Sequence, residues 1–227
     1  MYLINIIKDM GEIFSKYWKN FLFEGVGTTL ILSLVTVLFG AIAGALLAIC
    51  KMSKIKIVNW IITAFVEVIR GTPLLLQLYI GYFLIPSLLP FLELDEFSCV
   101  AIALILNSAA YVSEIVRSGI EAVDKGQTEA ARSLGLTGAT TMIQIVLPQA
   151  VKNILPALCN EFITIIKETS LASTFFVGEL MTVYLMVKGV TFNPIPTLMI
   201  VGVIYFILNF VLSKGLKLIE RRMKAHA

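Results

Sequence analysis

The sequence has few of the residues from which catalytic and metal sites are usually built. Its one histidine, His226, is next to last in the chain, which excludes a histidine-based metal site or catalytic triad. Its three cysteines, Cys50, Cys99 and Cys159, lie far apart in or beside apolar segments, and we interpret them as packing residues. No G-x-x-x-x-G-K-S/T loop occurs, so the chain does not bind ATP by that route. We predict no enzyme activity, no metal and no cofactor.

Charged residues are scarce as well. They make up 15% of the 227 residues, against about 25% in soluble domains. Hydrophobic residues make up 58%, against about 45–50%. The composition therefore predicts an integral membrane protein, with a single transmembrane domain over residues 1–227 and no room for a catalytic domain.

Long apolar runs predict an all-α fold with five spanning helices, because a helix needs about 20 apolar residues to cross a bilayer. The predicted spans are about residues 22–50, 57–89, 98–119, 151–169 and 194–218. In the first span, the small residues at 40–45 favour close helix packing.

The segments outside these spans are shorter and more mixed. Residues 1–19 carry a helical stripe of apolar residues among charges, which predicts an amphipathic helix on the membrane surface and no cleavable signal peptide. A frayed soluble tail is the alternative. Residues 170–193 are expected to form a loop, with room for a short helix that dips back to the membrane.

The basic residues predict the orientation of the spans. With the N-terminus outside, the inside segments hold 12 of the 18 lysines and arginines, and the outside segments hold 4. The other two, Arg70 and Lys167, lie in or near the membrane. This bias places the C-terminus and the polar segment 124–148 in the cytoplasm.

Segment 124–148 is the longest run in the second half of the chain that does not look like membrane. We predict a short helix over Gln127–Leu134 with Thr128 as its N-cap, ended by Gly135. A turn at 137–138 and a second amphipathic helix over 139–146 follow, and Pro148 is placed to begin a new helix. Two such helices beside a membrane indicate a segment that docks on another protein. An ordinary amphipathic loop helix is the alternative.

The same segment resembles the EAA signature of ATP-binding cassette (ABC) importer permeases. That signature is EAA, three residues, Gly, nine residues and I-x-L-P, and it matches here at Glu129, Ala130, Ala131, Gly135, Leu147 and Pro148. Residues 70–77 (RGTPLLLQ) and 167–172 (KETSLA) resemble the polar amino-acid branch, the histidine/glutamine/arginine-type permeases. The resemblance covers about residues 20–220.

The resemblance implies the type I ABC importer permease fold in a prokaryotic inner membrane. It implies that segment 124–148 is the coupling segment, with Glu129 and Gly135 holding the shape of the contact to a separate ATPase subunit that binds the ATP. The implied partners are two ATPase copies, a second permease subunit, for which we favour an identical chain over a sister chain, and an extracytoplasmic amino-acid-binding protein. No nucleic acid is expected.

Polar residues within the spans are candidates for a transport path, because charges in a bilayer are costly. Glu161 lies near the predicted midplane with no basic residue one turn away, so a cationic amino acid would suit it. The alternative for the others is internal ion pairing, of Glu67 with Arg70 and of Lys167 with Glu168 or Glu114. The predicted substrate-binding residues are Glu161, Arg70, Thr72, Gln77, Asn107, Tyr111, Glu114 and Thr164.

The second span is interrupted at residues 70–73. Proline removes a helix donor and disfavours helix before it, so Thr72 is expected to cap a new half-helix with Pro73 in its first turn. The free N–H groups and Arg70 would then face the membrane interior and read a substrate carboxylate. A proline kink with Arg70 paired to Glu67 is the alternative.

These observations favour the permease subunit of an ATP-driven importer of a basic amino acid such as arginine, lysine or histidine. A glutamine/glutamate-type permease is one alternative. An ATPase-independent secondary transporter or channel is another, and it leaves segment 124–148 without a purpose. A membrane scaffold that transports nothing would not need polar residues at the midplane.

Overall fold

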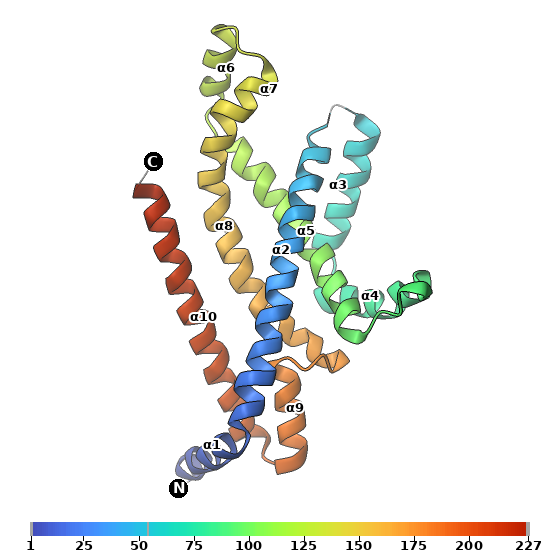
Figure 1. The fold of residues 1–227 in the computed structure, drawn as a ribbon, viewed down its shortest axis with the longest axis vertical. Helices are drawn as coiled ribbons and strands as arrows, with labels where there is room; N and C mark the ends of the chain where they lie inside the picture. Colours follow the sequence, from blue (N-terminus) through green and yellow to red (C-terminus); the bar gives the residue numbers. More distant parts are fainter. Residues whose placement is uncertain (1, 54, 226–227) are drawn as a thin grey trace.

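The computed structural model describes residues 2–53 and 55–225, and these residues form helices joined by short connections, with no strand among them (Figure 1). The all-helical fold is as predicted. Lys54 and His226, which entered the charge count and the exclusion of histidine sites, lie outside the described residues. The α-helices are α1 (Tyr2–Lys19), α2 (Val26–Lys51), α3 (Lys56–Gly71), α4 (Leu74–Leu88), α5 (Glu96–Glu121), α6 (Lys125–Ser133), α7 (Gly138–Thr141), α8 (Leu147–Glu168), α9 (Leu180–Thr191) and α10 (Pro194–Ala225).

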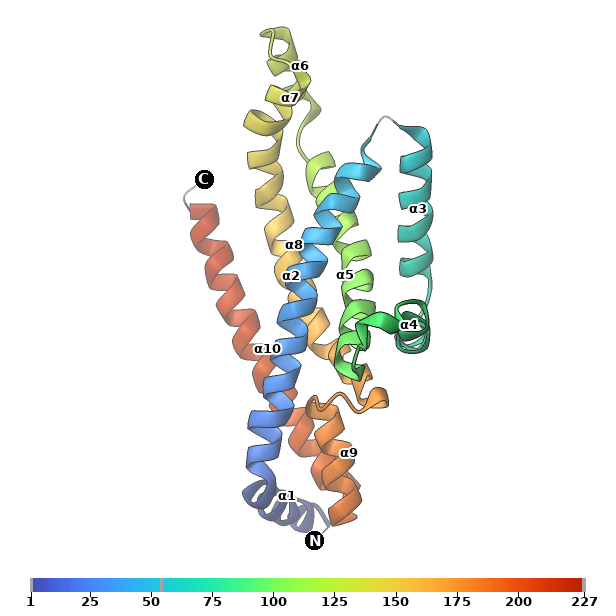
Figure 2. The same ribbon diagram turned by 45° about the vertical axis from the view of Figure 1, so that its right-hand side comes forward.

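Four helical stretches are long and apolar enough to cross a membrane within the described residues, namely Leu3–Lys51, Glu96–Glu121, Gly138–Phe175 and Pro194–Leu218. The second predicted span, 57–89, is a bent pair, because α3 and α4 meet at an angle of 113°. Figure 2 shows α3 antiparallel to α2, with α4 turned away from the direction of the bundle. The break falls at residues 72–73, inside the predicted interruption.

The helix boundaries differ from the predicted ones for local reasons. Helix α5 begins before residue 98 because the carboxylate of Asp95 caps it, accepting a bond from the Ser98 amide at 2.9 Å. Hydrogen bonds from Ser98 also lower the pKa of Asp95. Pro148 lies in the first turn of α8, which begins at Leu147, as predicted. A π-helical turn, Met142–Val146, joins α7 to α8, and this wider turn lies where the proline ring would meet the carbonyl of Gln144 in a regular helix.

Helix α5 is the centre of the molecule and packs against α2, α3, α4 and α8. Its contact with α2 is close because α2 presents glycines to it. A Cβ atom on Gly40 would lie 2.7 Å from the Ser108 hydroxyl, and one on Gly44 would lie 2.6 Å from the Cβ of Val112. The small residues at 40–45 therefore serve the predicted close packing.

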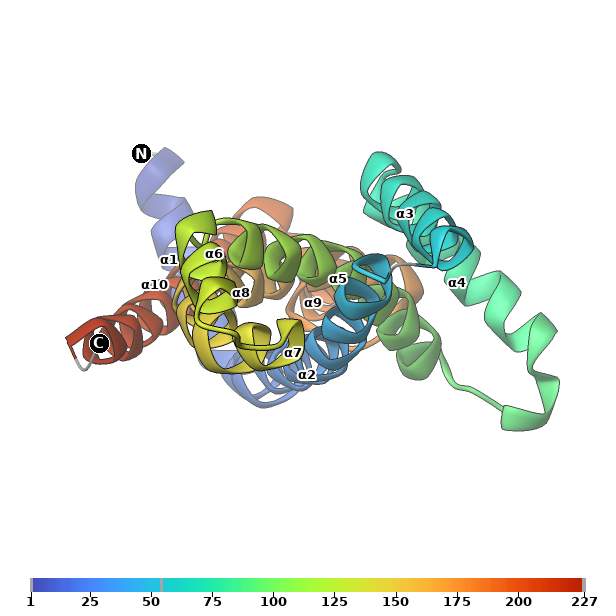
Figure 3. The ribbon, with the colours of Figure 1, turned by 90° about the horizontal axis from the view of Figure 1, so that it is seen from above.

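The two ends of the bundle carry different elements (Figures 1 and 2). Helix α1 lies across one end, beside α9 and the start of α10, and buries Ile6 and Ile13, so residues 2–19 are not a frayed tail. The predicted loop 170–193 consists of a 3-10 turn, Thr169–Phe175, and α9. Helices α6 and α7 project from the opposite end. Viewed from that end, α3 and α4 lie to one side of the bundle and α10 to the other (Figure 3).

Candidate functional site

The break between α3 and α4 is closed by its own side chains. The hydroxyl of Thr72 donates to the carbonyl of Val68 at 2.8 Å and so serves the end of α3. The residue before α4 is Pro73, and it makes no side-chain cap. The prediction that Thr72 caps the second half-helix is therefore wrong, because its hydroxyl bonds to the preceding turn.

Two predicted lining residues, Gln77 and Asn107, hold this break together. The Gln77 amide nitrogen lies 2.6 Å from the carbonyl oxygen of Ile69 and 3.0 Å from that of Thr72. The Gln77 amide oxygen accepts from Asn107 at 2.8 Å. Both amides are nearly buried, so Gln77 satisfies carbonyls that the bend leaves without helical partners. In this structure the pair braces α3, α4 and α5 against one another.

Glu114 lies among three cations. Its carboxylate is 2.5 Å from Lys51 of α2, 2.9 Å from Arg117 one turn along α5, and 3.6 Å from Arg70 of α3. Arg70 also lies over the ring of Tyr111, 5.5 Å from its centroid. This cluster joins three helices near the end that carries α6 and α7.

The cluster replaces the ion pairs that the sequence suggested. Arg70 leans toward α5 and not toward Glu67, so the predicted pair of Glu67 with Arg70 is wrong. Lys167 does not bind Glu114, whose oxygens are held by Lys51, Arg70 and Arg117. Because Glu114 is already neutralised, its geometry favours a structural ion cluster.

Glu161 has the opposite environment. It lies half-buried on α8 and faces Ser108 of α5, and Glu168 lies two turns further along the same side of α8. None of the salt bridges within the described part of the chain includes Glu161. Thr164, one turn further on, is half-buried too. An acid in such a place is stabilised when a cation comes to it.

The polar segment 124–148 is an exposed helix, a turn and a second helix. Helix α6 begins at Lys125 and not at Gln127, because Asp124 caps it by accepting from the Gly126 amide at 2.6 Å. Thr128 lies inside α6 and is not the cap. Glu129 and Ala130 are exposed, whereas Ala131 is buried where α6 packs on the π-helical turn.

Gly135 ends α6 as predicted, with a φ of +84° that disfavours other residues. The Leu136 amide bonds the Ala131 carbonyl at 3.1 Å, and the Gly135 amide bonds the Arg132 carbonyl at 3.0 Å, which is the Schellman pattern of a helix end. The Arg132 guanidinium adds a bond to the Leu136 carbonyl at 2.6 Å. The turn is therefore fixed, and it presents Leu134 with 82% of its surface exposed.

Glu179 is a polar residue of the core that the sequence reading missed. It is fully buried before α9 and accepts from the amides of Met181 and Thr182 at 2.6 and 2.7 Å and from the Tyr205 hydroxyl at 3.0 Å. The signal was a glycine followed by glutamate directly before an apolar run, typical of a helix N-terminus. This signal stands within 170–193, where the sequence predicts a loop with room for a short helix.

Comparison with known families shows what this arrangement belongs to. Residues 36–225 match the family described as binding-protein-dependent transport system inner membrane component. The chain belongs to this family. It is therefore a multi-pass inner-membrane permease, and the fold is that of the importers named below.

Two curated relatives cover nearly the whole chain. The chain is 43% identical to the arginine transport system permease protein ArtQ of Bacillus subtilis (strain 168), over 91% of this chain and 94% of that protein. It is 42% identical to the putative glutamine transport system permease protein GlnP of Rickettsia conorii, over 94% and 99%.

Solved structures show the same fold. A chain of an amino acid ABC transporter crystallised with histidines is 42% identical and superposes with a TM-score of 0.85, covering 92% of this permease and 96% of that chain. The MetNI methionine ABC transporter in an inward-facing conformation superposes with a TM-score of 0.73 at 20% identity, covering 89% and 95%, which shows the fold alone.

Proposed function

We propose that this permease is the transmembrane subunit of an ATP-driven amino-acid importer. The observation that carries the proposal is the α6–α7 segment, an exposed and internally braced pair of helices that continues into α8 through the π-helical turn. Such a segment suits a lever between a membrane helix and another protein. The relatives named for arginine and glutamine transport support amino acids as the substrate class.

The proposed assembly is an importer with its energy source on other subunits. Two ATPase subunits would bind at α6 and α7, around Glu129, Ala130, Ala131, Gly135, Leu147 and Pro148, and would hydrolyse the ATP. A second permease, favoured to be an identical chain, would complete the pathway, and an extracytoplasmic binding protein would deliver the amino acid. The basic-residue bias supports an outside N-terminus, with the C-terminus and α6–α7 in the cytoplasm.

This chain would perform no covalent chemistry. Its step in transport would be to change the side of the membrane from which the substrate site can be reached. ATP binding would draw the coupling segments of two permeases together and move each α8 relative to α5. This requires two packings of similar free energy that the ATPase can bias. The α5–α8 contact is where Glu161 faces Ser108, so the same movement would alter the surroundings of the substrate carboxylate.

The proposed substrate is a basic amino acid that brings its side-chain cation to Glu161, with Thr164 beside it. The unneutralised carboxylate of Glu161 favours a cation, in contrast to Glu114. Six other residues were predicted to share this role, and their bonds to one another now favour a role in bracing the helices. They are Arg70, Thr72, Gln77, Asn107, Tyr111 and Glu114. Of these, Arg70 and Tyr111 remain partly exposed and able to meet a substrate carboxylate.

The test is amino-acid-stimulated ATP hydrolysis by this permease purified with its ATPase partner. We expect arginine, lysine and histidine to stimulate, and we expect Glu161→Gln to raise their half-saturating concentrations about 10-fold to 100-fold, the worth of a hydrogen bond to a charged group. Glu96→Gln, which removes an exposed carboxylate at the start of α5, is the matched control and is expected to leave them unchanged.

Each other outcome has a defined meaning. Stimulation by glutamine or glutamate that ignores Glu161→Gln would keep the importer and contradict the basic substrate, moving selection to the binding protein. A permease that transports amino acids with no ATPase partner would contradict the importer itself and favour a secondary transporter.

A further inference from the structure

Helices α8 and α10 enclose a polar pocket with a volume of about 390 Å³. Its lining includes polar residues of both helices, namely Asn160, Thr164 and Lys167 of α8 and Ser213 and Lys217 of α10. Successive residues of a helix are about 100° apart, so Asn160 and Lys167 lie about 100° and 120° around α8 from Glu161. The pocket is therefore distinct from the place where Glu161 faces α5.

The pocket carries two positive charges from facing helices. Lys167 and Lys217 both line it, and its described lining residues include no aspartate or glutamate. Neither lysine takes part in a salt bridge among the described side chains. Glu168 follows Lys167 and interacts with it, but does not line the pocket. Because like charges repel and unpaired charge within a span is costly, the pocket favours an anion.

Lys217 lies at the depth of a lipid headgroup. The apolar stretch of α10 that is long enough to cross a membrane runs from Pro194 to Leu218, so Lys217 belongs to its last turn. This end of α10 points toward the end of the bundle that carries α6 and α7 (Figures 1 and 2). Lys167 lies deeper, and the long stem of a lysine lets its ammonium group reach toward the same headgroup.

The surface of α10 that leads to this depth is suited to acyl chains. An apolar stripe at helical spacing is 48–69% exposed and consists of Val203, Phe206, Ile207, Phe210 and Val211. At the end of the stripe, the ammonium nitrogen of Lys214 lies 5.5 Å from the centroid of the Phe210 ring. The order of groups along α10, apolar first and cationic last, matches that of a phospholipid with an anionic headgroup. A soluble anion would make no use of the stripe.

We propose that the pocket between α8 and α10 binds the phosphate of an anionic phospholipid from the leaflet at the α6–α7 end. Lys167 and Lys217 supply the charge, and the Ser213 hydroxyl and the Asn160 amide donate hydrogen bonds to the phosphate oxygens. The acyl chains lie along the exposed stripe of α10. Basic pockets between membrane helices bind anionic headgroups in this way. The proposal does not depend on which substrate is carried.

The test measures the lipids that the purified complex of permease and ATPase binds in detergent. The delipidated complex is titrated with dioleoylphosphatidylglycerol or dioleoylphosphatidylcholine, and native mass spectrometry gives the number bound and the dissociation constant. We expect one tight phosphatidylglycerol site per permease and about 10-fold weaker binding of phosphatidylcholine, which has no net charge. Lys167→Gln/Lys217→Gln is expected to weaken phosphatidylglycerol binding about 30-fold, the combined effect of two lysines near an anionic lipid.

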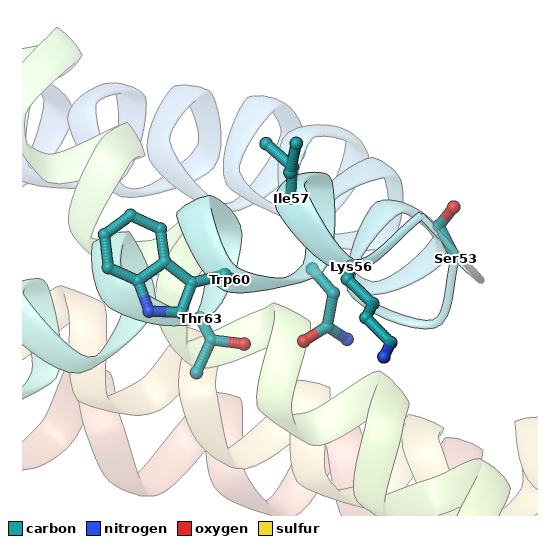
Figure 4. A pocket seen from close by; sticks show the side chains of 6 residues that line it. Ser53, Lys56, Ile57, Trp60 and Thr63 are labelled. Carbon is teal, nitrogen blue, oxygen red and sulfur yellow. The ribbon is translucent and has the colours of Figure 1, made fainter.

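Two further variants separate a built site from general attraction between charges. Lys56→Gln/Lys188→Gln is the matched control, because it removes the same charge from α3 and α9 and is expected to leave binding unchanged. Lys56 lies at the corner between α2 and α3, in another pocket whose described lining holds no second lysine (Figure 4). Ser213→Ala removes one donor and no charge, and we expect it to weaken binding about 5-fold. It also keeps the proposal testable if the double lysine variant does not fold.

Three outcomes would overturn the proposal. Equal weakening in both double variants, or unchanged binding in Lys167→Gln/Lys217→Gln and in Ser213→Ala, would show that the lipid binds elsewhere. Displacement of phosphatidylglycerol by excess inorganic phosphate would indicate a site for a soluble anion. A changed number of permease copies in the lysine variant, with unchanged lipid affinity, would indicate that the pocket meets a second chain. None of these outcomes bears on amino-acid-stimulated ATP hydrolysis, which tests the proposed function separately.

Discussion

Three glutamates of the helical bundle show how the surroundings of a residue decide its use. Glu114 is held by three cations and ties helices together. Glu179 accepts hydrogen bonds from two backbone amides and from the hydroxyls of Thr182 and Tyr205, so its charge is stabilised by donors that belong to the fold. Glu161 faces a hydroxyl and another acid. Only Glu161 therefore gains from the arrival of a cation.

Removal of the Glu179 carboxylate is expected to destabilise the permease. Glu179→Ala leaves the amides of Met181 and Thr182 without their partner at a fully buried position and removes the bond from the Tyr205 hydroxyl, at a cost of about 1–3 kcal/mol. Tyr205→Phe, which removes one of these bonds, is expected to cost less. Thermal unfolding of the detergent-purified protein measures both, with Glu12→Gln on exposed α1 as control. An unchanged Tm for Glu179→Ala would refute the capping role.

Single residues were the hardest level to predict from the sequence. Helical spacing along one chain segment does place Thr164 on the side of α8 that carries Glu161, as the sequence suggested. The partners of Glu114 were missed because Lys51 lies 63 residues away and only the packing of α2 on α5 brings them together. The Gln77 bond to Asn107, across 30 residues, was missed for the same reason.

Elements were more predictable, because each follows from a local pattern. The apolar runs, the break before Pro73 and the positive φ at Gly135 could all be read from neighbouring residues. The ends of elements differed where a side chain decided them, as at Asp95 and Asp124. Helix α9 lies in the predicted loop 170–193, for which a short helix was allowed, and at 12 residues it is too short to cross a membrane.

The contact between α2 and α5 requires a glycine at position 44 of α2, whereas the glycine at position 27 of the same helix lies in open space. In Gly44→Ala the new Cβ would lie 2.6 Å from Val112 and 2.8 Å from the Ala109 carbonyl, so the helices must separate. We expect a loss of about 1–3 kcal/mol. Gly27→Ala is the matched control, because nothing lies within 4 Å and alanine favours the helix by about 1 kcal/mol. Thermal unfolding of both variants checks this, and equal Tm values would refute the close contact.

At the scale of the whole molecule, close contacts between helices hold the bundle together. The glycine contact of α2 with α5, the Gln77–Asn107 pair and the Glu114 cluster bind α2, α3, α4 and α5 into one unit. Helix α8 packs closely on α5, where Gly119 leaves no room for a Cβ beside Ile154, and it continues into α7 and α6 through the π-helical turn. A force applied at α6 is therefore transmitted to α8, along which Glu161 and Thr164 lie.

This transmission requires that the turn at Gly135 keep its shape, and it gives the last prediction. Gly135→Asp forces a residue with a Cβ into a φ of +84°, at a cost of about 1–2 kcal/mol that the turn can relieve by changing shape. We expect amino-acid transport and stimulated ATP hydrolysis to uncouple, while membrane insertion and the amount of purified permease stay normal, since nothing lies within 4 Å of a Cβ at this position. Gly138→Asp is the matched control, because it adds the same charge in the first turn of α7, where the macrodipole favours an acid and φ is not positive.

If the Gly135→Asp permease transported normally with its ATPase, the docking role of the α6–α7 segment would be wrong. Loss of coupling in both variants would point to the added charge at the interface and would contradict the role of the turn geometry.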